Sequence, residues 1–208
     1  MDNLVIFGAG HMLEEARRLA AATLGETHID WVELTTADQF NFTLPDLAGW
    51  PANEWLAFVA LDERGLNLSR TQVVAELKGR GYKLHKLVAP DAIVAAGVSL
   101  GENTWVSNRC VVGAGSRLGL NAFLNVGVQL GRNCVFGKSA YACDGAVIED
   151  EVTISDFATI GSGAVVKTGA KIGRSSELRH RRAYCGVIPE KTFYIDVFPN
   201  AVSIISPM

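Results

Sequence analysis

Two glycines and a histidine near the N-terminus are the first residues in the chain whose types and spacing suggest chemistry. Residues 3–7 form an apolar run typical of a buried strand, and Gly8, Gly10 and His11 follow it at once. Residues 14–24 have the composition and spacing of a helix. A strand, a glycine turn and a helix in this order place backbone N–H groups where a phosphate binds well. This pattern makes Gly8, Gly10 and His11 candidate contacts for a phosphorylated substrate.

The glycine fingerprint is incomplete, because Leu13 stands where a dinucleotide-binding turn has its third glycine. A turn with a purely structural role fits the same residues equally well. Further strands are expected at residues 29–34 and 56–61, and a helix from Ser69 to Lys78. Residues 1–87 are thus predicted to form a small Rossmann-like unit, too short for a full dinucleotide fold. If the unit binds a ligand, a nucleotide-linked sugar is favoured over NAD.

The most regular feature of the chain is a six-residue repeat. Every sixth residue from Val94 to Ile172 is apolar, and the residue two positions earlier is small or β-branched. Such a period predicts a parallel β-helix in which three hexapeptides make one triangular coil. The order of small and then aliphatic residues is typical of left-handed β-helices. The predicted fold is therefore a Rossmann-like α/β unit followed by an all-β, left-handed parallel β-helix over residues 88–173. Residues 174–208 are expected to form a tail that covers the last coil.

Composition and the histidine and cysteine counts exclude several classes of function. The formal net charge of −3 and the pI near 5.8 argue against a nucleic-acid surface. No apolar run is long enough to insert into a membrane and no secretion signal is present, which predicts a cytoplasmic protein. The four histidines, His11, His28, His85 and His180, all lie outside residues 88–173, and no C-x-x-C spacing occurs. No metal site is predicted, because a zinc site on the β-helix would need histidines there.

This combination of a small α/β unit, a Gly-Ala-Gly turn and a hexapeptide helix resembles one group of sugar acyltransferases. These are enzymes of the sialic-acid O-acetyltransferase and bacillosamine N-acetyltransferase type, and the resemblance covers residues 3–191. Residues 160–166 (Ile-Gly-Ser-Gly-Ala-Val-Val) look like the last-coil segment of that family, and residues 185–191 are similar to its closing Gly-Val-Pro-Ala-Lys stretch. The resemblance implies a homotrimer with acetyl-CoA, or another acyl-CoA, in the groove between neighbouring β-helices. It also implies a UDP-linked amino sugar on the N-terminal unit.

The resemblance further implies that CoA contacts the last coils, at Gly161, Ser162, Ala164 and Lys167. A basic cluster follows within residues 174–182, and arginines pair well with the phosphates of CoA. Arg181 is the residue of this cluster that we select as a candidate CoA contact. A solvated face, partly balanced by Glu177, is the other interpretation of the same residues.

The sequence departs from that family at the expected catalytic motif. The motif has an Asn, seven residues later a His and an acidic residue, and then Cys-Val-Ile-Gly. Here Asn125 is in place, but Arg132 stands at the His position and Asn133 at the acidic one, and Tyr141 stands where relatives often carry a second His. Asn125, Arg132 and Tyr141 are candidate site residues on this basis.

None of these three residues is an obvious base. Arginine stays protonated, so Arg132 can bind an anion but cannot act as a base, and it can equally be a solvated turn residue. Tyr141 can donate to an oxyanion or simply pack. Any catalytic imidazole must reach the groove from outside the β-helix, so His180 and His11 are the candidate histidine bases. Asp144 and Asp156 are further potential bases of low specificity, because charged turn residues are common on such helices.

The absence of a histidine from the β-helix bears on which acceptor is acylated. General-base help typically contributes about 10²–10⁴-fold to a rate. A sugar hydroxyl is not ionised near neutral pH and needs that help, whereas an amine is partly neutral already. N-acylation of a nucleotide-linked amino sugar in cell-surface glycan biosynthesis is therefore the favoured function. Two alternatives stay open: a catalytically silent scaffold that binds a nucleotide sugar or a partner, and an acyltransferase with a non-sugar acceptor.

Overall fold

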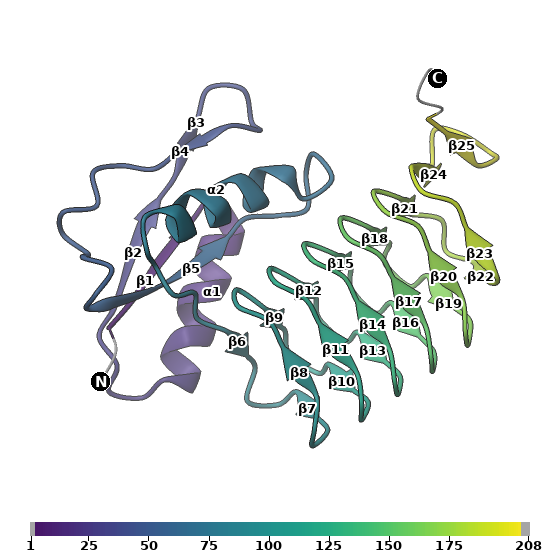
Figure 1. Cartoon of the computed structure of the whole chain (residues 1–208), viewed down its shortest axis with the longest axis horizontal. Coiled ribbons are helices and arrows are strands. Elements are labelled where there is room, and N and C mark those ends of the chain that lie inside the picture. The colour runs from purple at the N-terminus through teal and green to yellow at the C-terminus, as the bar shows by residue number, and fades with distance from the viewer. Residues whose placement is uncertain (1–2, 205–208) are drawn as a thin grey trace.

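The computed structural model describes residues 3–204 and shows two parts along the chain (Figure 1). A small α/β unit lies at one end, and stacked coils of a parallel β-helix continue from it to the C-terminal end. This arrangement confirms the predicted fold class, a Rossmann-like unit followed by a hexapeptide β-helix.

The N-terminal unit is a three-stranded parallel sheet with a helix on each face. The sheet order is β2 (Ile29–Glu33), β1 (Asn3–Gly8), β5 (Trp55–Ala60). Side chains of a strand alternate between the two faces of a sheet. Leu4 and Ile6 therefore pack against α1 (Gly10–Thr23), while Val5 and Phe7 pack on the side of α2 (Leu68–Gly79). The face that carries α1 is the one that meets the β-helix.

The segment after β2 contains a short antiparallel hairpin. Its strands are β3 (Thr35–Thr36) and β4 (Phe42–Thr43). The carboxylate of Asp38 accepts hydrogen bonds from the backbone N–H groups of Phe40 and Asn41, at 2.9 and 2.8 Å. An aspartate that binds its own backbone in this way stabilises a tight turn.

The β-helix consists of three parallel sheets, which form the faces of a triangular prism. Phe123 pairs with Trp105 and with Tyr141, so one coil takes eighteen residues. The first face is formed by β6 (Leu87–Val88), β9 (Trp105–Val106), β12 (Phe123–Leu124), β15 (Tyr141–Ala142), β18 (Thr159–Ile160), β21 (Glu177–Leu178) and β24 (Thr192–Tyr194), with β25 (Val202–Ser203) antiparallel to the last. The second is formed by β7 (Ile93–Val94), β10 (Val111–Val112), β13 (Gln129–Leu130), β16 (Val147–Ile148), β19 (Val165–Val166) and β22 (Ala183–Tyr184). The third is formed by β8 (Ser99–Leu100), β11 (Arg117–Leu118), β14 (Val135–Phe136), β17 (Thr153–Ile154), β20 (Lys171–Ile172) and β23 (Val187–Ile188).

The apolar repeat positions form the core of this prism. Residues from Val106 to Ile172 at six-residue spacing are buried, and so are the small residues two positions before them, including Cys110 and Cys134. At the first coil, Val94 and Leu100 are only partly buried because no further coil lies below them.

The coils continue past residue 173, where the repeat was predicted to end. Leu178 and Tyr184 keep the six-residue period and are buried, and β21 pairs with β18 on one side and β24 on the other. The predicted tail thus belongs to the β-helix up to Tyr194, and β25 then folds back on β24. Residues 205–208, the end of that predicted tail, lie outside the described residues.

A column of aromatic side chains joins the two parts of the molecule. Trp105, Phe123 and Tyr141 point outward from consecutive coils of the first face, with ring centroids 4.6 and 4.7 Å apart. All three are at most 2% exposed, because α1 and Phe58 of β5 cover them. Aromatic side chains bury large areas, so this column provides much of the contact between the two parts.

The guanidinium of Arg70 also joins the two parts of the molecule, because it links α2 to the β-helix. Arg70 is completely buried, and its Nε and Nη2 atoms donate to the side-chain and backbone oxygens of Asn121, at 2.9 and 3.0 Å. Its Nη1 donates to the carbonyl of Leu61 at 3.3 Å. Within residues 3–204 no carboxylate forms an ion pair with it, and burial lowers the pKa of Arg70 to about 10, so it stays charged at neutral pH.

Replacing Arg70 by Met is expected to lower the free energy of unfolding by about 3 kcal/mol, because carbonyl oxygens of Asn121 and Leu61 lose their donor while buried. Arg70→Lys should not restore stability, since an ammonium cannot reproduce the fork of donors. Urea unfolding followed by circular dichroism measures this. Arg80→Met, at the exposed end of the same helix, is the control and should change stability by less than about 0.5 kcal/mol. An Arg70→Met protein as stable as wild type would contradict the role given to this contact.

Candidate active site

The turn between β1 and α1 is closely fixed by its two glycines. A Cβ on Gly8 would lie 2.5 Å from the carbonyl oxygen of Ala60, so only glycine lets β1 and β5 approach here. Gly10 has a φ of +52°, which glycine adopts without strain. No side chain caps the start of α1. The first-turn N–H groups therefore face a space in which an anion would be stabilised.

A cavity of about 150 Å³ lies at this turn, and we call it the turn cavity. It lies at the carboxyl ends of the three parallel strands, where α/β sheets bind ligands. Arg64, on its wall, forms a bidentate ion pair with Asp62. The lining residues are Ala9, Gly10, His11, Leu34, Thr36, Phe42, Leu61, Asp62 and Arg64.

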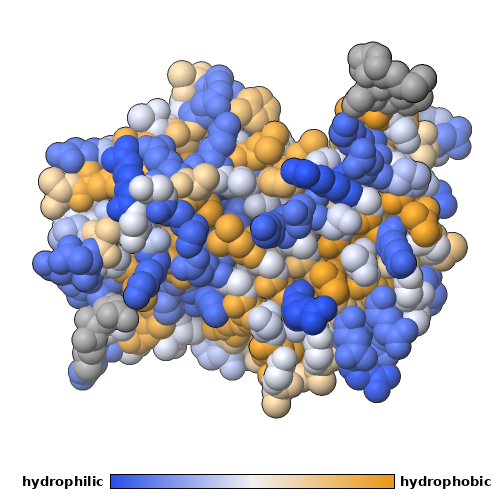
Figure 2. Space-filling model, viewed as in Figure 1, coloured by the Kyte–Doolittle hydropathy of each residue, from blue (hydrophilic) through white to orange (hydrophobic). Residues whose placement is uncertain are grey.

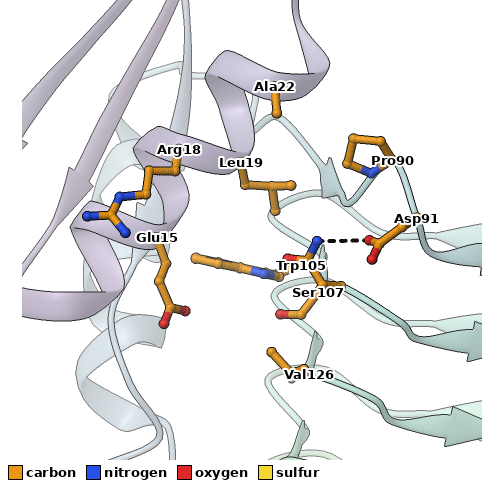
Figure 3. A pocket seen from close by; sticks show the side chains of 10 residues that line it. Glu15, Arg18, Leu19, Ala22, Pro90, Asp91, Trp105, Ser107 and Val126 are labelled. Carbon is orange, nitrogen blue, oxygen red and sulfur yellow. Dashed lines mark hydrogen bonds between the residues drawn. The ribbon is translucent and has the colours of Figure 1, made fainter.

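A second, more apolar cavity of about 440 Å³ lies between α1 and the first coils, and we call it the helix cavity (Figure 3). Leu19 and Ala22 of α1 face the ring of Trp105 across it, and Asn108 donates to Asp91 at 2.8 Å on the coil side. The indole Nε1 of Trp105 is buried, and none of the described residues accepts a hydrogen bond from it.

A third cavity, of about 520 Å³, lies where α1 meets the corner between the first and second faces, and we call it the corner cavity. It shares His11 with the turn cavity and Glu15 and Val126 with the helix cavity, so the three adjoin. Four consecutive coils and the β5–α2 loop complete its wall. The lining residues are His11, Met12, Glu15, Glu63, Asn125, Val126, Tyr141, Cys143, Asp144, Ser162 and Arg179.

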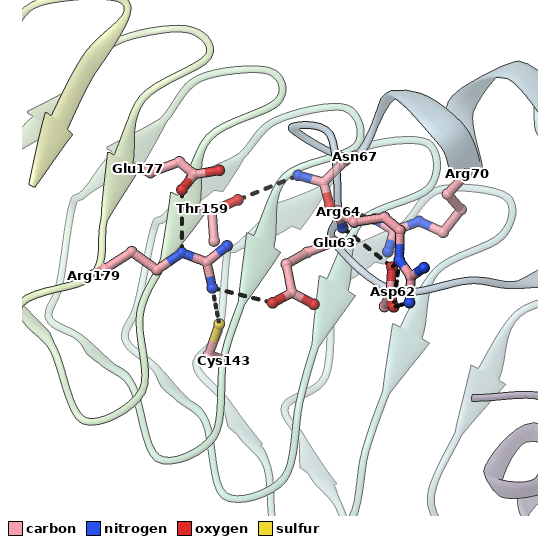
Figure 4. Close-up of polar contacts among 9 residues, drawn as sticks. All are labelled: Asp62, Glu63, Arg64, Asn67, Arg70, Cys143, Thr159, Glu177 and Arg179. Carbon is pink, nitrogen blue, oxygen red and sulfur yellow. Dashed lines mark hydrogen bonds and ion pairs between the residues drawn. The ribbon is translucent and has the colours of Figure 1, made fainter. Parts of the chain in front are cut away.

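One ion-paired group crosses the corner cavity (Figure 4). The guanidinium of Arg179 donates to Glu63 of the β5–α2 loop at 3.1 Å and to Glu177 of β21 at 3.2 Å. Burial works against the charge on Arg179, but the two carboxylates outweigh it and raise its pKa. Glu63 is consequently engaged in holding the N-terminal unit to the β-helix.

Two other carboxylates of the corner cavity have no such partner. Among the described residues, nothing forms a hydrogen bond or ion pair with the side chains of Glu15 and Asp144, although both line the cavity. With Glu63 they make three carboxylates against the single guanidinium of Arg179. The cavity is therefore negative overall at neutral pH and suits a positively charged group.

The thiol of Cys143 and the phenol of Tyr141 are neutral at physiological pH. Burial and then the nearby Glu63 raise the pKa of Cys143 to about 12, and burial also raises the pKa of Tyr141. The ring of Tyr141 stacks on Phe123 at an interplanar angle of 12°. Neither group is poised to act as a nucleophile or base, since each would have to lose a proton first.

The thiol of Cys143 should accordingly resist alkylation. A pKa of about 12 leaves a thiolate fraction of about 10⁻⁴ at pH 8. We expect iodoacetamide at pH 8 to modify the exposed Cys185 and to spare Cys143, as measured by peptide mass spectrometry over time. Unfolding in urea should make both thiols equally reactive. Rapid labelling of Cys143 in the native protein would show that its thiol is activated after all.

The structure brings together some of the sequence-predicted site residues. His11, Asn125, Tyr141 and Ser162 all line the corner cavity, and Gly10 lines the turn cavity that adjoins it. Tyr141 reaches the cavity wall while its ring packs in the aromatic column.

Two predicted catalytic residues lie elsewhere in the chain. Arg132 is at the corner between the second and third faces, where Asp150 accepts from its guanidinium at 2.6 Å and from its backbone N–H at 2.8 Å. His180 packs edge-on against Tyr194, with Nε2 4.0 Å from Asp196. Neither lines the corner cavity of its own chain, so their catalytic roles stay predictions.

Three of the predicted CoA contacts, Ser162, Lys167 and Arg181, are exposed, whereas Gly161 and Ala164 are buried. The side chain of Ala164 is completely buried in the β-helix core, so only its backbone can face a ligand. Lys167 pairs with Glu149, and Arg181 donates to the carbonyl of Ser162 at 3.4 Å. At Gly161 a Cβ would lie 2.7 Å from the Cα of Arg179, so coil stacking by itself requires glycine there.

Sequence reasoning did not assign Cys143 and Arg179 to the site, although a signal for them exists. Asn125, Cys143, Gly161 and Arg179 are eighteen residues apart and occupy the same corner of successive coils. Counting by eighteen from Asn125 would have found them. Glu15 and Glu63 carry no such signal, because a helix and a loop of the other unit supply them.

Comparison with solved structures shows the same fold in several proteins. The acetyltransferase domain of PglB from Neisseria gonorrhoeae FA1090 matches with a TM-score of 0.80 and 24% identity, over 93% of this chain and 96% of that one. PerB from Caulobacter crescentus, in complex with CoA and GDP-perosamine, matches with a TM-score of 0.82 and 24% identity, over 98% of each chain. WeeI from Acinetobacter baumannii AYE matches with a TM-score of 0.71 and 16% identity, over 97% of this chain and 100% of that one. No protein-family model matches the chain, and no curated protein sequence is significantly similar to it.

Within residues 3–204, no helix is long and apolar enough to cross a lipid bilayer. No group of three or more His, Cys, Asp or Glu side chains in that range is arranged to hold a metal ion.

Proposed function

We propose that this protein is an acyl-CoA-dependent N-acyltransferase that acylates the amino group of a nucleotide-linked sugar. The observation that carries the proposal is the negative corner cavity, which adjoins a glycine turn suited to phosphates. The shared fold supports it: PerB was solved with CoA and GDP-perosamine, and the PglB domain with acetyl coenzyme A.

The nucleotide part of the acceptor fits the turn cavity. Its diphosphate would lie against the N–H groups at the start of α1, where the helix dipole favours negative charge. His11 lines both cavities, so a sugar attached to that diphosphate extends into the corner cavity. This places the sugar beside Asn125, Tyr141 and Asp144.

The charge of the corner cavity favours an amine over a hydroxyl as the acceptor group. A protonated amine is attracted by Glu15, Glu63 and Asp144, whereas a neutral hydroxyl gains nothing from them. The bound ammonium first loses one proton to water, and the neutral amine then attacks the thioester carbonyl. The N–C bond forms, an oxyanion develops on the carbonyl oxygen, and the C–S bond breaks to release CoA. The side-chain amide of Asn125 can donate to that oxyanion.

We expect the acyl-CoA to bind in the groove between neighbouring β-helices of a homotrimer in the cytoplasm. Gly161, Ser162, Lys167, Arg181 and the backbone of Ala164 would contact it. Figure 2 shows hydrophobic side chains gathered over the coils of the β-helix, and exposed apolar surface of this kind is typical of protein interfaces.

The test is a transfer assay with matched acceptors. Purified protein is incubated with acetyl-CoA and with UDP-, dTDP- or GDP-linked sugars that carry either an amino or a hydroxyl group at the same carbon. CoA release is measured with a thiol reagent and the product by mass spectrometry. We expect the amino sugars to be acylated at least about 10²-fold faster than their hydroxyl partners, because a neutral amine already carries a nucleophilic lone pair whereas a hydroxyl must be deprotonated as it attacks. Equal rates for the two acceptors would contradict N-acyl transfer.

The second candidate function is a catalytically silent scaffold that binds a nucleotide sugar or a partner. The ion pair formed by Arg132 favours it. Arg132 stands at the position of the catalytic histidine in the enzymes that the sequence resembles. Its guanidinium is already ion-paired with Asp150. Calorimetry separates the two candidates: no detectable binding of acetyl-CoA would support the scaffold, whereas micromolar binding would support the enzyme. Binding of acetyl-CoA without turnover of any amino sugar would favour a non-sugar acceptor.

A further inference from the structure

The corner cavity holds three carboxylates, and they are not equivalent. Glu63 is ion-paired with Arg179, so its negative charge is already balanced by that guanidinium. Glu15 stands on α1, and it also lines the helix cavity. Asp144 stands on the β-helix itself and lines the corner cavity alone among the three cavities described.

The backbone around Asp144 is rigidly held. The carbonyl of Asp144 accepts from the N–H of Gly163 in the next coil at 3.0 Å, and the N–H of Gly145 donates to Val126 in the previous coil at 2.9 Å. The carboxylate itself is exposed and has no hydrogen-bond partner among the described residues, so it is available to a substrate bound in the corner cavity.

The neighbours of Asp144 are the groups that the reaction needs. Asn125 lies on the preceding coil of the same corner and Ser162 on the following one, and all three line the cavity. Tyr141 and Cys143 line the same cavity as Asp144. Burial is the largest cause of the raised pKa of each, and the charge of Asp144 contributes to it.

We propose that Asp144 is the catalytic residue that accepts the proton lost by the acceptor amine, an assignment that rests on the proposed function. When the amine attacks the thioester, its nitrogen becomes positively charged and the carbonyl oxygen negatively charged. The carboxylate of Asp144 takes one N–H proton. The C=O bond then re-forms, the C–S bond breaks, and CoA leaves as a thiolate. The proton on Asp144 passes to that thiolate or to water, which restores the carboxylate.

A carboxylate suits this step although it is a weak base. The ammonium in the tetrahedral intermediate is far more acidic than the free substrate ammonium, because the carbonyl carbon withdraws electrons from it. The same carboxylate attracts the protonated acceptor into the cavity. It could not deprotonate a sugar hydroxyl effectively, so the assignment also implies that amines are the acceptors.

The experiment compares Asp144→Asn, Asp144→Ala and Glu15→Gln, with Glu190→Gln as the control for loss of one exposed carboxylate at another corner. Steady-state rates are measured with acetyl-CoA and the best amino sugar found for the wild-type protein. We expect Asp144→Asn to lower kcat by about 10²–10³-fold. Sodium formate should restore activity to Asp144→Ala in proportion to its concentration, because a small carboxylate can enter the vacated space. It should not restore Asp144→Asn, in which the amide still fills that space.

Each result has a defined meaning. A kcat for Asp144→Asn within threefold of wild type overturns the assignment while leaving N-acyl transfer intact. A large loss confined to Glu15→Gln assigns the step to α1 instead. If Asp144→Ala is inactive and formate does not restore it, the carboxylate is not the proton acceptor. A wild-type protein inactive with every amino sugar overturns the proposed function as well.

Discussion

The contact between α1 and the first face of the β-helix positions every group at the candidate site. Trp105, Phe123 and Tyr141 provide it, because aromatic rings on three consecutive coils give the N-terminal unit a continuous apolar surface. The column changes to Thr159 and Glu177 in the next two coils. The corner cavity lies where the aromatic column ends, so the same sequence change that ends the hydrophobic contact also creates room for a ligand.

The β-helix contributes precision to this site through its register. Each coil stacks on the last with an offset of eighteen residues, so the chain builds vertical columns of side chains at each corner. One such column, with Asn125, Cys143, Gly161 and Arg179, forms the wall that faces α1. The backbone hydrogen bonds between coils hold these positions rigidly, which is what a site for directed proton transfer requires.

The sequence allowed the fold to be predicted well because the repeat is long and strictly periodic. The glycine turn was also predicted, since Gly8 and Gly10 are required by backbone geometry alone. The end of the β-helix was misplaced at residue 173, although Leu178 and Tyr184 continue the period, because the arginine-rich corner between them resembles a tail. The carboxylates Glu15 and Glu63 could not be assigned. Their place in the site depends on how one unit docks on the other, and no local pattern encodes that docking.

Arg132, which stands where the sugar acyltransferases that the sequence resembles carry a histidine, lies apart from the corner cavity. Arg132 and Asp150 form an ion pair at a corner remote from the cavity within the same chain, while the cavity carries the carboxylates of Glu15 and Asp144, which have no such partner among the described residues. The amine acceptor proposed above is compatible with a negative cavity.

The most direct measurement is a crystal structure of the Asp144→Asn protein with a nucleotide-linked amino sugar and CoA bound. The diphosphate should lie at the start of α1, with the amino nitrogen of the sugar about 3 Å from the side chain at position 144. A nucleotide bound away from the Gly8–Gly10 turn, or an amino group directed toward Arg132 or His180 instead, would contradict the arrangement inferred from these cavities.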